Sequence, residues 1–284
     1  MSAALHRVVG ECSLSRRVRR DGLVVRGPDA AEWLQGQVTQ DVKDLPIGTS
    51  VLTLVLSPQG KIDSFCRVTR EGDDEFLLDT ESGFGPSLSE RLRRFKLRVK
   101  VELEEVSLEC SERLGGGFDS LGRPEPAGDE ASPDTLGEEF ERERIRAAVP
   151  RLGRELTEQT IPQEAGEELL ARTVSFTKGC YTGQELVARL DARGSNVARR
   201  LRVVEGSLAP SEPDPEPGES LLDENDKEAG TLTSSVRSSP ESFVALCYLR
   251  RAYLHDAADL RLRGRSVTVA APRSKGEASE GDRE

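Results

Sequence analysis

The sequence has very few of the side chains that usually hold metals or act as acid–base catalysts. Histidine occurs only as His6 and His255, and tryptophan and methionine occur once each. A dyad of Cys180 with His255 has no support in the sequence. The spacing of the cysteines includes no Cys-x-x-Cys pair, which argues against a disulfide framework and a zinc site, so no metal ligands are predicted. The five cysteines are Cys12, Cys66, Cys110, Cys180 and Cys247.

Long apolar runs are also missing. No stretch approaches the ~20 apolar residues that a membrane span requires, and Met1 to Arg20 contains no apolar segment of a secretory signal. Hydrophobic residues make up 36% of the 284 residues, and the mean hydropathy is −0.50. These features favour a soluble protein of the cytoplasm, with room for two or three modest domains.

Positive charge is in deficit, since the net charge is −11. Proteins that bind nucleic acids generally have a basic stripe and a high pI, so this class is not favoured. One basic cluster has two interpretations: a solvated helix face that continues into an edge strand, or a site for an anionic partner such as a polyglutamate tail. It consists of Arg91, Arg93, Arg94, Lys96, Arg98 and Lys100. Glycine-rich nucleotide motifs of the G-x-x-x-x-G-K-[ST] and G-x-G-x-x-G types are absent.

Residues 1–112 alternate between strand and helix patterns. Leu88, Leu92 and Phe95 recur at helical spacing, whereas Val99 and Val101 alternate with charged residues as in a strand. This mixture predicts an α+β domain of split βαβ type. The predicted strands cover residues 22–26, 51–56, 61–69, 75–79 and 98–108, and the predicted helices cover residues 28–37 and 86–95.

The rest of the chain divides by composition. Residues 113–205 are predicted to form a shortened middle domain, in which a Gly-, Pro- and acid-rich loop (115–137) precedes a helix at 138–148. Short strand-like runs after an acidic, proline-rich loop (211–217) predict a small β-barrel over residues 206–272. A disordered tail is expected at 273–284. The remaining predicted elements are a short helix at 163–170, a helix from Gly183 and a strand at 197–204.

The segment Lys-Gly-Cys-Tyr-Thr-Gly-Gln-Glu at 178–185 is the most informative part of the sequence. Cys180 lies between glycines, two residues after Lys178 and just before a predicted helix. A nearby cation and a helix N-terminus both lower the pKa of a thiol, and glycines allow a ligand to approach the backbone. The alternative is a small buried side chain, because free cysteine is often buried. The residues alone leave both interpretations open.

This segment resembles the signature of YgfZ-type folate-binding proteins, relatives of the glycine-cleavage T-protein (aminomethyltransferase). The similarity extends through Arg189 to Arg193 and Gly194, and it appears upstream at residues 161–164. Residues 26–30, 33–37 and 39–42 resemble the family's first helix. The resemblance covers most of residues 20–270 in the family's order, and it implies a T-protein-like multi-domain fold.

The resemblance also implies a function and a site. Family members bind a tetrahydrofolate or a one-carbon derivative of it, and they act with client or assembly proteins in iron–sulfur cluster assembly or repair. The expected reactive thiol is Cys180, and Arg189 or Arg193 is expected to contact the anionic folate tail. The expected folate-binding residues are Lys178, Tyr181, Gly183, Gln184, Glu185, Arg189 and Arg193. An ordinary helix-surface pair of Glu185 with Arg189 is the alternative for those two residues.

Two departures bear on the alternative function, a folate-dependent aminomethyltransferase of the T-protein type. T-proteins have a pterin-binding Glu and a pair of acidic residues, and the corresponding positions here are Arg146, Ser64 and Phe65. A guanidinium only donates hydrogen bonds, so Arg146 cannot replace that carboxylate. These losses favour an accessory factor over an enzyme. A third interpretation is a scaffold that has lost its ligand, against which the intact segment around Cys180 argues.

The cysteines are expected to differ in reactivity. Cys66, Cys110 and Cys247 lie in or beside predicted strands and are expected to be buried, whereas Cys12 is expected to be exposed but without nearby donors. Cys180 is expected to react fastest, on a loop that faces a cleft between the N-terminal domain and the barrel.

Overall fold

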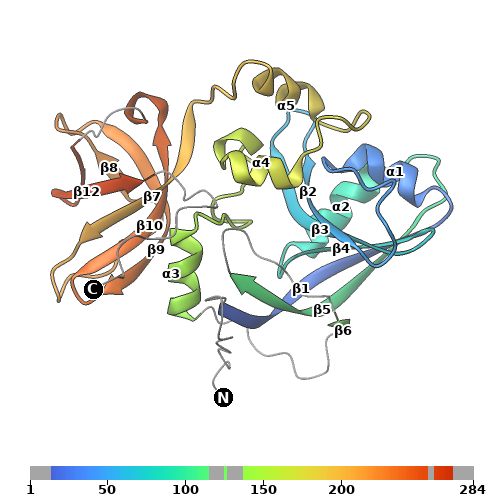
Figure 1. Cartoon of the computed structure of the whole chain (residues 1–284), viewed down its shortest axis with the longest axis horizontal. Helices are drawn as coiled ribbons and strands as arrows, with labels where there is room; N and C mark the ends of the chain where they lie inside the picture. Colours follow the sequence, from blue (N-terminus) through green and yellow to red (C-terminus); the bar gives the residue numbers. More distant parts are fainter. Residues whose placement is uncertain (1–13, 115–124, 127–136, 255–258, 271–284) are drawn as a thin grey trace, which may run out of the picture.

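The structure is a computed structural model that describes residues 14–114, 125–126, 137–254 and 259–270. An antiparallel sheet with two covering helices forms the N-terminal part, and a closed barrel forms the C-terminal part (Figure 1). Helices and loops of residues 137–198 connect the two. The α+β class and the C-terminal barrel predicted from the sequence are therefore confirmed. Within the described residues, no helix is long and apolar enough to cross a membrane.

The N-terminal sheet has the strand order β2-β3-β4-β1-β5-β6, and its described pairs are antiparallel. Helices α1 (Ala30–Gln37) and α2 (Gly85–Arg94) contribute Trp33, Leu34, Leu88 and Leu92 to a core shared with the sheet. The strands are β1 (Leu14–Arg26), β2 (Ser50–Leu56), β3 (Ile62–Gly72), β4 (Glu75–Glu81), β5 (Glu102–Leu114) and β6 (Glu125–Pro126).

The two faces of this sheet differ in chemistry because side chains alternate along a strand. On β1, Leu23 and Val25 pack under the helices, whereas Val18 and Val24 belong to a smaller cluster. The buried carboxylate of Asp79 accepts hydrogen bonds from Arg20 at 2.6 Å and Arg67 at 2.7 Å. A buried charge is tolerated only when it is paired in this way.

The prediction that a strand begins at residue 98 is wrong. Strand β5 begins at Glu102, and residues 95–101 form an irregular connection from α2. Arg98 has a φ of +57°, a left-handed conformation that interrupts a strand. The alternation of Val99 and Val101 arises because both pack against the N-terminal core from this connection.

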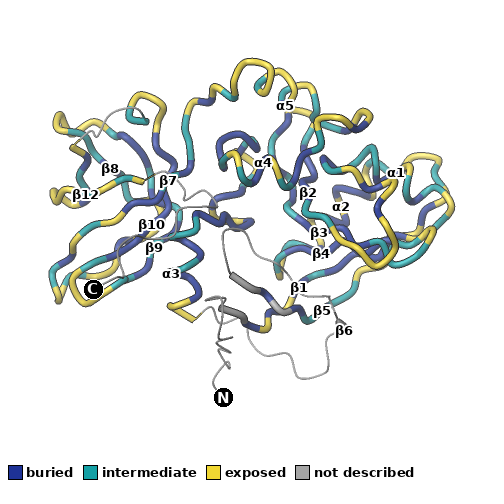
Figure 2. The backbone as a smooth tube through the Cα atoms, in the orientation of Figure 1, coloured by how far each residue is buried: buried dark blue, intermediate teal, exposed yellow. Residues whose placement is uncertain are grey.

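The segment after α3 (Glu138–Arg146) packs on the edge of the N-terminal sheet. It contains η1 (Pro162–Glu164), α4 (Glu167–Thr173) and α5 (Gln184–Asp191). Its apolar residues share one core with Leu54, Leu56 and Ile62 of β2 and β3. Figure 2 shows that α5 and the loop that follows it are largely exposed, and Val187 is the buried residue of that helix.

The barrel closes in the order β10-β7-β12-β11-β8-β9. The barrel includes the strand that begins at Arg199, which falls within the predicted middle domain of residues 113–205. Its strands are β7 (Arg199–Ser207), β8 (Ser220–Leu222), β9 (Glu228–Ser239), β10 (Ser242–Arg250), β11 (Leu260–Leu262) and β12 (Arg265–Ala270), with η2 (Arg251–Tyr253) after β10. The predicted loop at 115–137 and the predicted tail lie mostly outside the described residues.

Helix α3 joins the barrel to the rest of the molecule. Ile145 and Ala148 pack against Leu201, Val244 and other barrel residues. The guanidinium of Arg144, which is fully buried, donates to Glu141 at 2.7 Å and to Glu155 at 3.1 Å. Glu155 also accepts a hydrogen bond from Ser234 of β9 at 2.5 Å. A continuous buried polar network therefore connects α3 to the barrel.

Helix α3 ends in a Schellman motif with alanine in place of the usual glycine. Ala148 has a φ of +52°, its N–H donates to Ile145 O at 2.9 Å, and the N–H of Val149 donates to Arg144 O at 3.0 Å. A side chain in this conformation is unfavourable, whereas glycine adopts it freely.

Replacing Ala148 with glycine is therefore expected to raise the free energy of unfolding by about 1 kcal/mol, less the small methyl burial that is lost. The measurement is urea unfolding monitored by circular dichroism. Ala147→Gly is the matched control. Because Ala147 has the right-handed conformation, glycine at this position is expected to lower the free energy of unfolding. Equal destabilisation of both variants would contradict the prediction.

Candidate functional site

Residues 178–183 of the signature segment belong to the loop between α4 and α5, which lies against the end of α1, and residues 184–185 begin α5. The N–H of Thr182 donates to Gly36 O at 3.1 Å, and the N–H of Ser175 donates to Thr39 O at 3.0 Å. The loop therefore docks on residues 35–40 of the N-terminal domain. The sequence marks residues 33–37 and 39–42 as family-like, but no local feature of the sequence identifies them as a docking surface.

Lys178 anchors the loop. Its buried ammonium donates to Gln35 O at 2.6 Å, Val38 O at 2.7 Å and Gln40 O at 2.9 Å, which uses all three donors. A cation is favourable beside the carbonyls that end a helix. Burial lowers the pKa of Lys178 to about 8, and the three carbonyls act in the opposite direction because they favour the charged form. Lys178 thus fixes the loop and has no donor left for a ligand in this conformation.

Tyr181 anchors the other side of Cys180. Its side chain is buried in the core shared with β2 and β3, and burial raises its pKa to about 12. The Lys178 ammonium lies 5.2 Å from the centre of its ring, in cation–π geometry. Both neighbours of the Gly179–Cys180 pair are therefore held in place by the body of the protein.

Gly183 is required by packing. It begins α5 with a φ of +83°, and a Cβ atom there would lie 2.5 Å from Ser57 O and 2.9 Å from Leu56 Cβ. Gly60, in the turn that faces Gly183, is also tightly packed, because a Cβ atom on it would lie 2.8 Å from Leu186. These glycines let the loop approach the turn after β2. Gly179 is different, because a Cβ there would meet no atom within 4 Å.

Cys180 is exposed, whereas Cys66, Cys110 and Cys247 are buried, as predicted for those three. Burial raises the pKa of the Cys66 and Cys247 thiols to about 12, and it also raises the pKa of Cys110. A protonated buried thiol is a poor nucleophile. Cys12 lies outside the described residues.

Cys180 is therefore expected to be alkylated faster than the three buried cysteines, by at least about a hundredfold at pH 7. The measurement is timed modification with iodoacetamide, followed by mass spectrometry of each cysteine-containing peptide. A control in denaturant should bring the four rates close together, because unfolding removes the effect of burial. Faster modification of Cys66, Cys110 or Cys247 in the native protein would contradict the assignment.

The remaining predicted ligand residues lie on or after α5. Gln184 is half-buried, and Glu185, Arg189 and Arg193 are exposed. Within the described part of the chain, no ion pair joins Glu185 to Arg189, so the helix-surface pair considered from the sequence is not formed. The structure thus places an amide, a carboxylate and two guanidinium groups on the segment that follows Cys180.

The positions that the family resemblance equates with T-protein carboxylates hold different groups here. Ser64 is buried on β3, and its hydroxyl has no hydrogen-bond partner among the described residues. Arg146 donates to Glu143 at 3.0 Å on the surface of α3. Asp63, on the other face of β3, accepts from Arg91 at 2.9 Å. None of these groups reproduces a carboxylate free to bind a pterin.

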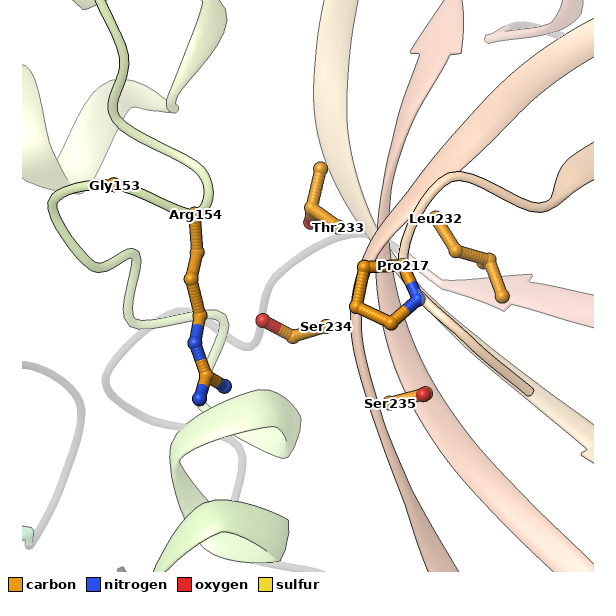
Figure 3. A pocket seen from close by; sticks show the side chains of 7 residues that line it. All are labelled: Gly153, Arg154, Pro217, Leu232, Thr233, Ser234 and Ser235. Carbon is orange, nitrogen blue, oxygen red and sulfur yellow. The ribbon is translucent and has the colours of Figure 1, made fainter. Parts of the chain in front are cut away.

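A separate pocket of about 460 Å³ lies between the loop after α3 and the barrel. Figure 3 shows Arg154 on one side and the hydroxyls of β9 on the other. Cys180 is not among its lining residues, so the signature loop lies beside α1 rather than in this interdomain pocket. The lining residues are Gly153, Arg154, Pro217, Leu232, Thr233, Ser234 and Ser235.

The chain is similar in sequence to known protein families and to curated relatives. Residues 18–112 match the family described as GCVT N-terminal domain, and residues 199–274 match the family described as CAF17, C-terminal beta-barrel domain. The chain is 30% identical over 258 residues to the tRNA-modifying protein YgfZ of Serratia proteamaculans, covering 76% of this chain and 77% of that protein. An uncharacterized protein of Haemophilus influenzae is 29% identical over 228 residues, with 75% and 80% covered.

The fold has a solved counterpart. The crystal structure of the glycine cleavage system aminomethyltransferase T from Bartonella henselae superposes with a TM-score of 0.65, covering 88% of this chain and 82% of that chain at 17% identity. This likeness concerns the fold. The sequence match over more than three quarters of a relative, together with the two domain matches, shows that the chain belongs to the YgfZ-type family of proteins related to the T-protein.

Proposed function

We propose that the protein is a tetrahydrofolate-binding accessory factor that helps to assemble or repair iron–sulfur proteins in support of tRNA modification. Membership of the YgfZ-type family supports this proposal, since relatives carry the name tRNA-modifying protein. The observation that carries it is Cys180, an exposed thiol that the buried side chains of Lys178 and Tyr181 hold in place.

The donor set around the thiol suits a reduced folate. Arg189 and Arg193 supply two exposed cations for the glutamate tail, with charge-assisted hydrogen bonds. Gln184 and Glu185 supply acceptors for the donor edge of the pterin, and the open space at Gly179 leaves the backbone accessible. A bound tetrahydrofolate would supply a carrier for one-carbon units, while Lys178, Tyr181 and Gly183 hold the loop that presents the thiol.

The aminomethyltransferase alternative is disfavoured by the same structure. Ser64 and Arg146 occupy the positions of the expected carboxylates, and Arg146 is paired with Glu143 on the surface of α3. A general base must accept a proton, which a guanidinium does not do at neutral pH. A T-protein-like fold therefore does not by itself imply aminomethyl transfer here.

Calorimetric titration with tetrahydrofolate tests the ligand. Arg189→Ala or Arg193→Ala is expected to weaken binding about tenfold or more, because each removes a charge-assisted hydrogen bond. Arg251→Ala, an exposed arginine beside the barrel, is the control and should bind as the unmodified protein does. Unchanged affinity in both signature variants would remove these residues from the site. No binding by the unmodified protein would overturn the folate proposal.

The role of the thiol is tested in cells that lack the protein. Cys180→Ser is expected to fold normally and to fail to restore the activity of an iron–sulfur enzyme and the level of modified tRNA nucleosides. The readouts are enzyme assays and mass spectrometry of hydrolysed tRNA. Full rescue by the serine variant would show that the exposed thiol is not required.

A further inference from the structure

The end of α2 and its connection to β5 carry a run of cations that the fold neutralises only in part. Residues 91–101 contain six basic residues and no acidic one, in a chain with a net charge of −11. Arg91 binds Asp63 and Leu56 O, Arg93 binds Ser89 and Leu103 O, and Arg94 binds Glu90. These first three arginines are thus used within the fold.

The next three cations, by contrast, have no such partners among the described residues. Lys96, Arg98 and Lys100 make no side-chain hydrogen bond or ion pair with any residue in the described ranges, and Arg98 and Lys100 are exposed. By contrast, Arg26 is paired with Glu104 at 2.5 Å and Lys43 with Glu32 at 2.5 Å, although both pairs are exposed. We call residues 96–100 the basic loop.

The basic loop is held at both ends by α1 and the residue before it, through Phe95, which precedes the loop, and through Lys100. The indole N–H of Trp33 donates to Phe95 O at 3.3 Å, and the N–H of Lys100 donates to Asp29 Oδ2 at 2.7 Å. Gly27 permits this approach, because a Cβ there would lie 2.2 Å from Lys100 O. The loop is therefore a defined element whose charges are presented at a fixed place on the N-terminal domain.

The tip of the basic loop is exposed in an unusual way. Leu97 is 77% exposed, and the adjacent Arg98 has the left-handed backbone conformation, with a φ of +57°. A leucine this exposed contributes nothing to the core, and the left-handed conformation is unfavourable for a non-glycine residue. Contact with a partner would account for the exposed Leu97 and the left-handed Arg98, because it would bury Leu97 and pair the neighbouring cations.

We propose that the basic loop binds the phosphate backbone of RNA, with tRNA as the partner. Three unpaired cations on one short segment fit a polyanion, and binding to it would release counterions. An arginine fork also matches the geometry of phosphate oxygens. The choice of RNA over an acidic protein surface rests on the proposed function in tRNA modification. The overall negative charge confines the contact to this loop.

The test measures binding of total tRNA by fluorescence anisotropy between 50 and 200 mM salt. A variant with Lys96, Arg98 and Lys100 all replaced by Gln is expected to bind at least about tenfold more weakly and to reduce the slope of log K against log salt by about 2. The matched control replaces Lys227, Arg251 and Arg261 by Gln, which changes the net charge equally on the barrel side and should leave the slope unchanged. Thermal melts of both variants confirm that they are folded.

Equal loss of tRNA binding in the two triple variants would overturn the proposal, because it would indicate a general charge effect. Failure of the unmodified protein to bind tRNA, or preferential binding of polyglutamate to the basic loop, would overturn it too. Tetrahydrofolate titration separates this result from the proposed function. Normal folate binding with no effect of the loop substitutions on tRNA refutes the loop alone, whereas absent folate binding with the expected loop effect refutes the folate proposal alone.

Discussion

Replacing Arg144 with methionine is expected to lower the free energy of unfolding by about 3–5 kcal/mol, because it leaves buried carboxylate charge without its main partner. Glu155 is fully buried and lies 3.1 Å from the Arg144 guanidinium. Burial acts to lower the pKa of Arg144, but the carboxylates of Glu155 and Glu141 outweigh it, so its pKa is raised. The guanidinium also donates to Val149 O in the Schellman motif, so its loss affects the end of α3 as well.

The measurement is urea unfolding at neutral pH, with fluorescence and circular dichroism compared because the chain has several cores. Arg146→Met is the matched control two residues away, where the exposed pair with Glu143 should contribute at most about 1 kcal/mol. Adding Glu155→Gln to the Arg144 variant removes the stranded charge and should recover part of the loss. A loss below about 1 kcal/mol for Arg144→Met would contradict the role of this network.

Replacing Gly183 with alanine is expected to destabilise the protein by about 2–4 kcal/mol. The new side chain would have an unfavourable φ, and its Cβ would overlap a backbone carbonyl and Leu56. Ser57 O is backbone and cannot rotate away, so α5 or the facing turn must shift. The displaced loop should also present Cys180 less uniformly, which iodoacetamide kinetics would detect.

Gly179→Ala is the control within the same loop. A methyl group there enters open space, and Gly179 is not among the glycines with positive φ, so the stability should change by less than about 0.5 kcal/mol. Thermal and urea unfolding of the two variants give the comparison. Equal stability of Gly183→Ala and the unmodified protein would contradict the prediction, because it would show that the turn after β2 shifts at little energetic cost to accommodate the new Cβ atom. Weaker tetrahydrofolate binding by a stable Gly179→Ala variant would support a ligand at that position.

Local pattern predicted the elements well where local forces decide them. The spacing of Leu88 and Leu92 predicted α2, and strand-like runs bounded by turn residues predicted β2, β3 and β4 to within a few residues. The start of β5 was wrong because Arg98 adopts a left-handed conformation that side-chain alternation does not reveal. The closed barrel order was likewise beyond local pattern, since β7 pairs with both β10 and β12.

The roles within the signature segment were less predictable. The residues alone left open whether Cys180 is functional or a small buried side chain, and the family resemblance implied a functional thiol with ligand-facing neighbours. The structure shows Lys178 and Tyr181 turned inward as supports, and the partners of Lys178 lie 138 to 143 residues away in the chain. Contacts at such a separation leave no periodicity in the sequence. The cations of the basic loop are visible in the sequence as part of a basic cluster, but only the structure separates the paired arginines from the unpaired residues.

The anchoring of Lys178 has a mechanical consequence. Among the described residues, the long-range hydrogen bonds of Lys178 and Thr182 are with residues 35–40 and not with the barrel, while the chain reaches β7 through residues 192–198. The barrel is fastened elsewhere, through Glu155 to Ser234 and through the packing of α3. A substitution that weakens the barrel contact would therefore leave the ammonium of Lys178 and its three carbonyl partners in place, and Cys180 would keep its position relative to α1.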